Sequence, residues 1–120
     1  MDFNSAKKYL DGLVSYEAME KAPYKGIDLE KFKSVFERSG VGVEGVKFVH
    51  VGGSKGKGTV CGMAAEYLVG IGCKVGLFTS PHLVDVRERV RVDGEMISEV
   101  EFGENVEWVR GLGEEMTYFE

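Results

Sequence analysis

Cysteine and histidine are scarce in this sequence of 120 residues, which contains two of each. Cys61 and Cys73 are too few and too far apart for a disulfide framework or a zinc site, so we expect reduced thiols near the core. His50 and His82 show no spacing typical of metal ligands, which favours a strand histidine and a loop histidine over a metal site. The composition therefore gives no support to a metal centre built from thiols and imidazoles.

Positive charge is also in short supply. The chain has 15 Lys and Arg against 20 Asp and Glu, a net charge of -5. This balance argues against general nucleic-acid binding, because a phosphate backbone is met by a basic surface. No apolar run approaches the length of a membrane span, and residues 1–5 lack the basic start and apolar stretch of a signal peptide. We expect a cytoplasmic protein that binds neither nucleic acid nor a membrane.

What the sequence does have is an ordinary globular composition and many glycines. Apolar residues make up 43% and charged residues 29%, which favours a soluble globular protein over a disordered one. A chain of this length forms one small domain at most, and it is equally compatible with part of a larger protein. The 17 glycines concentrate between Gly40 and Gly76, which makes that stretch the first candidate for a functional loop.

A glycine-rich loop lies between an apolar run, Val46–Val51, and a helical pattern. This order is typical of a phosphate-binding loop, in which backbone N–H groups and the positive end of the following helix meet an anion. Lys57 would add a cation at the β- and γ-phosphates of a nucleotide. The Walker A pattern nevertheless fails, because Val51 stands at its first glycine and the hydroxyl comes one residue late, at Thr59. We favour phosphate binding over the alternative, a tight strand-to-helix turn with a solvated lysine.

Capping residues and apolar periodicity predict four helices. The first helix is expected from a cap at Asn4 or Ser5 to about Met19, and the second from a cap at Asp28 to Gly40. The third is expected from the end of the glycine-rich loop to Gly72. The fourth is expected to begin at a capping box formed by Ser98 and Glu101 and to end at Gly111 and Gly113. The third helix shows the clearest apolar stripe, at Val60, Met63, Ala64, Tyr67, Leu68 and Ile71.

Strands are expected on both sides of the third helix, at Val46–Val51 and Lys74–Thr79. Residues 46–79 then form a β-loop-α-β unit with parallel strands and a right-handed crossover. The turn Ser80–Leu83 follows the second strand, at the edge of the sheet where ligands of open α/β folds bind, so it shares that edge with the glycine-rich loop. The predicted fold class is α/β, a P-loop-type parallel sheet with flanking helices.

A hairpin is expected next, because Asp93 and Gly94 separate two short apolar segments, residues 90–92 and 95–97. Arg87, Arg89 and Arg91 alternate with other residues and would share one face of an extended segment. Charge alone favours a solvated strand face, and an anionic ligand nearby would change that interpretation.

Two stretches of the sequence resemble the folylpolyglutamate synthase and dihydrofolate synthase family, relatives of the Mur peptide ligases. Residues 52–59, GGSKGKGT, match the family loop A-G-T-N-G-K-G-[ST], which accounts for the late hydroxyl. Residues 74–83, KVGLFTSPHL, and the following ERVRV are close to the family's K-V-G-L-F-T-S-P-H-L and E-R-I-R-I. The resemblance extends through the closing TYFE and, more loosely, back to residues 27–31.

The resemblance implies an enzyme that uses ATP to convert a carboxylate of a pteroate or folate into an acyl phosphate, which the amino group of L-glutamate attacks. It implies ATP and Mg²⁺ as cofactors, and folate or dihydropteroate and L-glutamate as partners. Lys57 becomes the catalytic candidate, and Thr59 and Ser80 become candidate metal ligands. The nucleotide-binding candidates are Gly53, Ser54, Lys55, Gly56, Lys57, Gly58 and Thr59. The substrate-binding candidates are Ile27, Asp28, Leu29, Pro81, His82, Arg89, Thr117, Tyr118, Phe119 and Glu120.

Two departures from the family pattern matter. Lys55 replaces the Asn of the family loop, which adds charge at the nucleotide, and Gly52 replaces its Ala. The family's further Mg²⁺ ligands, its modified lysine and its C-terminal domain would follow residue 120, so we expect residues 1–120 to be part of a single N-terminal ATP-binding domain. We also expect weak or absent ligase activity. The alternatives are another P-loop kinase or NTPase, and a non-catalytic nucleotide-binding module or degenerate fragment.

Overall fold

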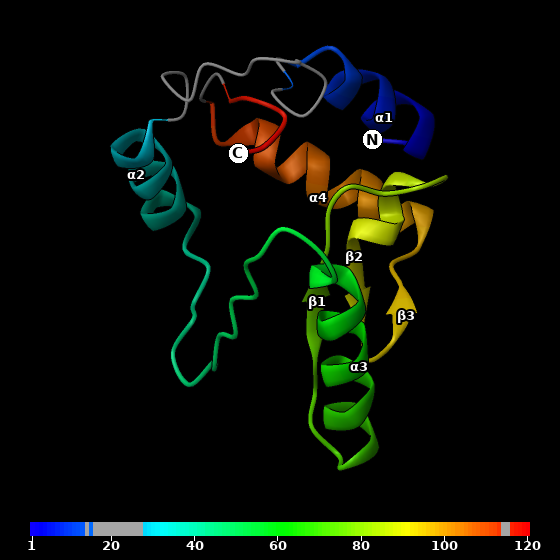
Figure 1. Cartoon of the computed structure of the whole chain (residues 1–120). Coiled ribbons are helices and arrows are strands. Elements are labelled where there is room, and N and C mark those ends of the chain that lie inside the picture. Colours follow the sequence, from blue (N-terminus) through cyan, green and yellow to red (C-terminus); the bar gives the residue numbers. More distant parts are fainter. Residues whose placement is uncertain (14, 16–27, 114–115) are drawn as a thin grey trace. The chain divides into compact units, whose positions relative to one another are not determined.

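The computed structural model describes residues 1–13, 15, 28–113 and 116–120, shown as coloured ribbon in Figure 1. The chain divides into two compact units. The first unit is Met1–Gly45 with Phe102–Glu120, and the second unit is Val46–Glu101. Ile27 lies outside the described residues. The first helix was expected to run to about Met19, and this expectation is wrong, because the helix ends at Asp11 with Gly12 as its C-cap.

The first helix of the first unit is α1 (Phe3–Asp11). Its N-cap is Asp2, whose carboxylate accepts the backbone N–H of Ser5 at 3.0 Å, so the predicted cap at Asn4 or Ser5 is wrong. A carboxylate outcompetes the neighbouring neutral side chains because it also interacts favourably with the positive end of the helix. The helical residues end at Asp11, and Gly12 is the C-cap.

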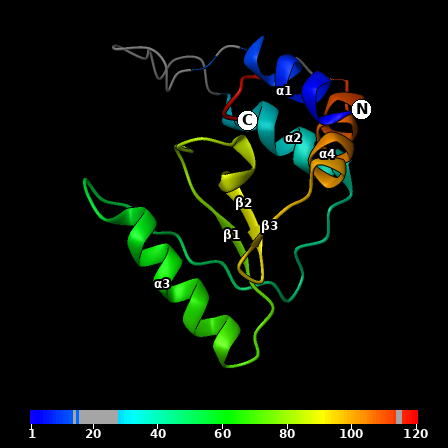
Figure 2. The ribbon, with the colours of Figure 1, turned by 90° about the vertical axis from the view of Figure 1, so that its right-hand side faces the viewer.

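Helix α1 packs against α4 (Glu99–Gly111), of which the residues from Phe102 on belong to the first unit (Figures 1 and 2). The rings of Phe3 and Phe102 meet edge to face with centroids 5.4 Å apart, and Ala6 is completely buried. Gly103 is required here, because a Cβ atom at this position would overlap the carbonyl oxygen of Met1. The contact between α1 and α4 is therefore part of the core of the first unit, to which Val35 and Met116 also belong.

Helix α2 (Leu29–Ser39) has the predicted caps. The Asp28 carboxylate accepts the N–H of Lys31 at 3.0 Å, and Gly40 ends the helix in the left-handed conformation. The apolar stripe is only partly covered by the described residues, since Val35 is 4% exposed but Leu29 is 72% exposed.

The second unit contains a three-stranded sheet in the order β1 (Gly76–Phe78), β2 (Val90–Val92), β3 (Glu95–Met96). The predicted hairpin is confirmed: β2 and β3 pair antiparallel, and Asp93 and Gly94 have φ angles of 51° and 87°. Positive φ at both turn positions is the type I′ geometry that matches the twist of the strands.

Helix α3 (Lys57–Gly70) follows the glycine-rich loop and lies along β1 (Figures 1 and 2). Its predicted end is confirmed, because Ile71 is the C-cap and Gly72 follows with φ of 89°. The predicted stripe is mostly on the exposed side, however. Met63 and Tyr67 are each 68% exposed, whereas Ala65 is buried. The helix is apolar nearly all round, so spacing alone cannot identify the face that packs.

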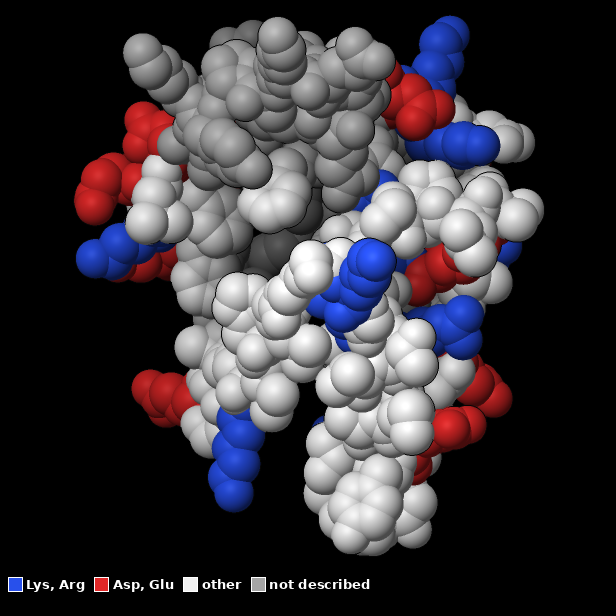
Figure 3. All heavy atoms as spheres, viewed as in Figure 1, with Lys and Arg blue, Asp and Glu red and all other residues white. Residues whose placement is uncertain are grey.

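The exposed side of α3 appears in Figure 3 as a nearly uncharged surface, with basic atoms gathered where the helix begins. Cys61 is half-buried and Cys73 is exposed, so the expectation of a thiol near the core is wrong for Cys73. The tight turn after α3 carries Cys73 outward, because residues 71–76 lead around the end of the helix to β1.

The predicted strand Val46–Val51 and its parallel pairing are not found among the described residues. Residues 46–51 have no ladder partner there, and the strand that was expected to pair with them, β1, pairs antiparallel with β2. Phe48 and Val49 are 75% and 79% exposed. A buried parallel strand needs neighbours and helices on both faces, and the described residues provide none for this run.

Candidate functional site

The glycine-rich loop ends at Gly56, which is the N-cap of α3 and has φ of 75°. A non-glycine residue would be strained in this conformation. The first intrahelical bond of α3 runs from the N–H of Val60 to the carbonyl of Gly56 at 3.0 Å. The N–H groups of residues 57–59 therefore precede the helical ladder, and no side chain caps them. These donors and the positive end of the helix are able to interact favourably with an anion.

Lys57 adds a cation to these donors. Its ammonium donates a hydrogen bond to the carbonyl oxygen of Gly53 at 2.7 Å, so the side chain folds back over its own loop. A Cβ atom at Gly52 or Gly58 would meet nothing within 4 Å. Packing among the described residues therefore does not require glycine at either position, and both glycines leave the backbone open to the close approach of an anion.

The remaining nucleotide-binding candidates are brought together with Lys57 in the second unit. Ser54, Lys55 and Thr59 are all exposed. Lys55 places a second ammonium on the same loop, so the predicted extra charge is present beside the candidate anion site. The arrangement of donors and cations can hold a polyanion such as a triphosphate.

The turn Ser80–Leu83 leads into η2 (Val86–Arg89), a short 3₁₀ helix before β2. The carboxylate of Glu88 accepts the backbone N–H groups of Leu83, Val84 and Asp85 at 2.9, 3.0 and 2.8 Å. These bonds, that from Leu83 first, hold the pKa of Glu88 below its usual range. One side chain thus organises the backbone of the whole turn.

The expectation that Arg87, Arg89 and Arg91 share one strand face is wrong, because the first two lie in η2 and only Arg91 lies in β2. Asp85 is the reason: its carboxylate caps η2 by accepting the N–H of Arg87 at 2.9 Å. The same carboxylate accepts hydrogen bonds from both Nε and Nη2 of Arg87, which raises the pKa of that guanidinium. Arg87 is therefore a structural residue of this turn.

Arg89 lies between the turn and the sheet and is 9% exposed. Its Nε–H donates a hydrogen bond to Nδ1 of His82 at 2.9 Å. Its carbonyl accepts the N–H of Thr79 at 2.9 Å, which ties η2 to the residue that follows β1. His82 is half-buried, whereas Ser80 and Pro81 are exposed, so the candidate metal ligand Ser80 and the candidate substrate contacts Pro81 and His82 lie in one short segment.

The other substrate-binding candidates belong to the first unit. Asp28 and Leu29 are exposed at the start of α2. Thr117 and Glu120 close a turn on each other: the Glu120 carboxylate accepts the N–H of Thr117 at 2.8 Å, and the Thr117 hydroxyl accepts the N–H of Glu120 at 3.3 Å. Tyr118 is half-buried and Phe119 is 62% exposed in this turn.

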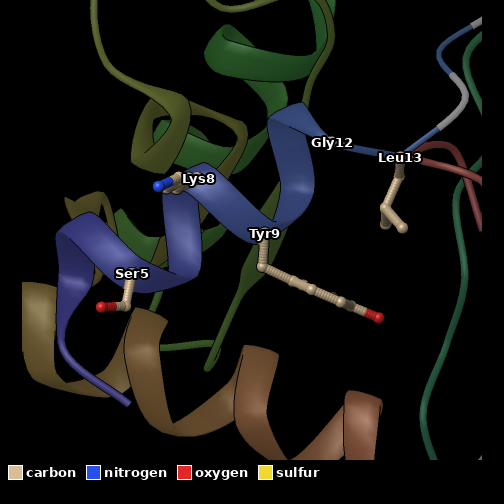
Figure 4. A pocket seen from close by; sticks show the side chains of 5 residues that line it. All are labelled: Ser5, Lys8, Tyr9, Gly12 and Leu13. Carbon is tan, nitrogen blue, oxygen red and sulfur yellow. The ribbon is translucent and has the colours of Figure 1, made fainter.

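A hollow of about 480 Å³ also lies in the first unit, along α1 (Figure 4). It is lined by Ser5, Lys8, Tyr9, Gly12 and Leu13, none of which the sequence predicts as a site residue. The ring of Tyr9 lies under the guanidinium of Arg110, 5.4 Å from centroid to Cζ, so it helps to pack α1 against α4.

The hydrogen-bond donors and oxygen atoms of the candidate site determine which ligands it can hold. The loop fits phosphate groups, because it offers backbone N–H groups and ammonium groups together. Among the described residues no three His, Cys, Asp or Glu side chains form a group that could hold a metal ion. The hydroxyls of Thr59 and Ser80 are neutral oxygen donors, and they fit a Mg²⁺ ion whose charge is met chiefly by nucleotide phosphates.

Comparison with known proteins gives a consistent result, although no protein-family model matches the chain. The chain is 50% identical over 60 residues to a folylpolyglutamate synthase of Arabidopsis thaliana, covering 50% of this chain and 10% of that protein. It is 45% identical over 73 residues to the mitochondrial folylpolyglutamate synthase of Homo sapiens, covering 58% and 12%. The chain is similar to the folylpolyglutamate synthases.

Solved structures of such synthases share the fold. A bifunctional folylpolyglutamate synthase/dihydrofolate synthase with Mn, AMPPNP and L-glutamate bound matches with a TM-score of 0.79 and 32% identity, over 99% of this chain and 27% of that one. The predicted α/β fold class and the family resemblance are thereby confirmed. The chain spans about a tenth of the length of the two curated synthases. Within the described residues, no helix has the length and apolar character to cross a membrane.

The structure adds two contacts that sequence reasoning missed, the Glu88 bonds to the turn and the bond from Arg89 to His82. Asp85 and Glu88 have the spacing of a capping box, and both of its hydrogen bonds are present. That pattern would have predicted a helical turn over residues 86–89. The bond from Arg89 to His82 has no comparable local signal, because it depends on the path of the whole turn.

Proposed function

We propose that this chain supplies nucleotide-binding and substrate-binding elements of an ATP-dependent ligase that joins L-glutamate to a folate or dihydropteroate through an acyl phosphate. The observation that carries the proposal is the start of α3, where uncapped N–H groups, glycines without packing neighbours and Lys57 come together. The similarity to folylpolyglutamate synthases supports the substrate class.

The proposed nucleotide site is the loop Gly53–Thr59. Its N–H groups donate to the phosphates, and the Lys57 ammonium exchanges the Gly53 carbonyl for a phosphate oxygen, where it stabilises the charge of the transferring group. Mg²⁺ is the proposed metal, with Thr59 and Ser80 as oxygen ligands beside the phosphates. The solved synthase that holds AMPPNP and Mn supports a nucleotide with a divalent cation.

The proposed substrate contacts in the second unit are Pro81, His82 and Arg89, on the segment that carries Ser80. In the first unit, Asp28 and Leu29 and the turn Thr117–Glu120 remain proposed contacts, with Ile27 outside the described residues. The cytoplasmic location stays a prediction from sequence.

Binding of a non-hydrolysable ATP analogue with Mg²⁺ tests the nucleotide site. Lys57→Ala should weaken binding about tenfold or more, because hydrogen bonds to charged groups contribute roughly 1.5–3 kcal/mol. Alanine is a good helix former, so α3 should stay intact. Lys74→Ala, which removes an exposed lysine of the same unit outside the loop, is the matched control and should bind like the parent chain. Absence of binding by the parent chain would overturn the proposal.

A non-catalytic nucleotide-binding module is the second candidate, because the donors at the start of α3 fit phosphate groups whether or not a ligation step follows. Glutamate ligation measured on the purified chain separates the two. We expect nucleotide binding with weak or absent ligation. Robust ATP- and Mg²⁺-dependent ligation would show that these residues complete a catalytic site, and would exclude the module.

A further inference from the structure

We infer that Arg89 is a positioning residue, which fixes His82 as a hydrogen-bond donor through Nε2 toward an acceptor oxygen or nitrogen of the ligand. The bond between Arg89 Nε and His82 Nδ1, the burial of Arg89 and the anchoring of the turn by Glu88 carry this inference. The identity of the ligand as a folate or dihydropteroate rests on the proposed function. The state of His82 does not.

The donor in this pair determines the tautomer. A guanidinium has only N–H donors, so Nδ1 of His82 must be the acceptor and carry no proton. The single proton of the neutral imidazole is then on Nε2. Second-neighbour hydrogen bonds commonly select the imidazole tautomer in this way, for instance in metal sites and catalytic triads. Here the selection leaves His82 with a donor on the ring edge opposite Arg89.

Burial distinguishes the role of Arg89 from a direct ligand contact. Its side chain belongs to a residue that is 9% exposed, while His82 is half-buried and the adjoining Pro81 is exposed. The residue that can meet a ligand is therefore His82. Arg89 acts through it, which refines the proposed substrate contact at Arg89 to an indirect one.

The backbone around the pair is fixed at both ends, so the imidazole cannot simply move away. Glu88 holds the N–H groups of residues 83–85 after the histidine, and the Arg89 carbonyl holds the N–H of Thr79 before it. The Thr79 hydroxyl also donates to the Glu88 carbonyl at 3.4 Å. Glu88 therefore holds the turn through its carboxylate and its carbonyl, and the adjacent Arg89 holds it through its carbonyl. Such support keeps a contact residue in one geometry before the ligand arrives.

Nitrogen NMR of the histidine side chains tests the inference on the full chain. His82 should show the Nε2–H tautomer and a scalar coupling to Arg89 Nε across the hydrogen bond. The signals of the two histidines are assigned with His50→Gln. In Arg89→Met the coupling should vanish and the tautomers should mix. Arg91→Met, a change in the neighbouring strand, is the matched control and should leave His82 unchanged.

The inference fails if His82 of the parent chain shows the Nδ1–H tautomer, or if it shows no scalar coupling to Arg89 Nε. Circular dichroism checks folding, and Arg89→Lys replaces Arg89→Met if that variant unfolds. Lysine, like arginine, has only N–H donors, so folded Arg89→Lys should keep the Nε2–H tautomer of His82. A dominant Nδ1–H tautomer in folded Arg89→Lys would equally overturn the inference.

Ligand binding is tested separately, by titration with folate and with dihydropteroate. His82→Gln keeps an N–H donor near the position of Nε2 without needing Arg89. Arg89→Met should weaken binding at least fivefold in the parent chain and less than twofold in the His82→Gln background. Equal losses in both backgrounds would show that Arg89 does not act through His82. If neither ligand binds while the tautomer is as expected, the proposed substrate fails and the positioning role stands.

Discussion

Gly58→Ala should make the chain more stable and its nucleotide binding weaker. Gly58 is the second residue of α3, and a Cβ atom there would meet nothing within 4 Å. Replacing glycine by alanine in a helix stabilises it by roughly 0.5–1 kcal/mol. With an unfolding entropy near 2.1 cal/mol/K per residue over 120 residues, this gain corresponds to about 2 to 4 °C in the melting temperature.

The loss of binding has a different origin. In the proposed site the phosphates approach the backbone of residues 57–59, and a methyl group at Gly58 would stand in that approach. Loss of one N–H to phosphate bond, worth roughly 1.5–3 kcal/mol, weakens affinity about ten- to hundredfold. Calorimetric titration with a non-hydrolysable ATP analogue measures this effect, and thermal unfolding of the same samples measures the gain in stability.

Gly62→Ala is the matched control, because Gly62 lies one turn further along the same helix and a Cβ atom there would also meet nothing within 4 Å. It should gain the same stability and keep the parent affinity. If both variants bind like the parent chain, the phosphates do not approach Gly58. If both lose affinity equally, the effect comes from the helix rather than from the anion site.

Two further predictions concern the packing of the first unit and the turn after β1. Phe102→Ala should lower the free energy of unfolding by about 3–5 kcal/mol, because Phe102 is only 7% exposed. Val100→Ala in the same helix should change it little, because Val100 is 67% exposed. Chemical denaturation of both variants measures the difference. The pKa of Glu88 is lower in the folded chain than in the unfolded chain. Its carboxylate therefore adds to the free energy of unfolding at pH values above the ordinary glutamate pKa of about 4.3, and this stabilisation is lost as the pH falls through the lower pKa of the folded chain. Glu88→Gln should abolish that part of the acid dependence, and an unchanged difference between unfolding at pH 6 and pH 3 would contradict this assignment.

Local signals predicted the fold well wherever neighbours in sequence decide the geometry. The caps at Asp28 and Gly40, the box of Ser98 and Glu101, and the Asp93-Gly94 turn all form as expected. Each depends on contacts within a few residues, for which residue type is nearly sufficient information. The glycine-rich loop before α3 belongs to the same group.

Expectations that depended on distant partners were less successful. The run Val46–Val51 has the composition of a buried strand, but composition cannot supply the neighbouring strands that such a run needs. Arg87 and Arg89 alternate as in a strand, yet the carboxylates of Asp85 and Glu88 hold them in a 3₁₀ turn. The same holds for the candidate site. Its glycine-rich loop was predicted from a local pattern, whereas the hydrogen bond from Arg89 to His82 was not predicted.

The hydrogen bond from Lys57 to Gly53 has a consequence for how tightly the loop can bind. A lysine side chain carries about 2 kcal/mol of rotamer entropy, much of which is already lost when the ammonium is tied to its own loop. A phosphate oxygen that replaces the Gly53 carbonyl would therefore find the cation already ordered, and its arrival would free a peptide oxygen instead of immobilising a side chain. The contribution of Lys57 to affinity therefore depends on how much stronger its hydrogen bond to a phosphate oxygen is than its hydrogen bond to the Gly53 carbonyl.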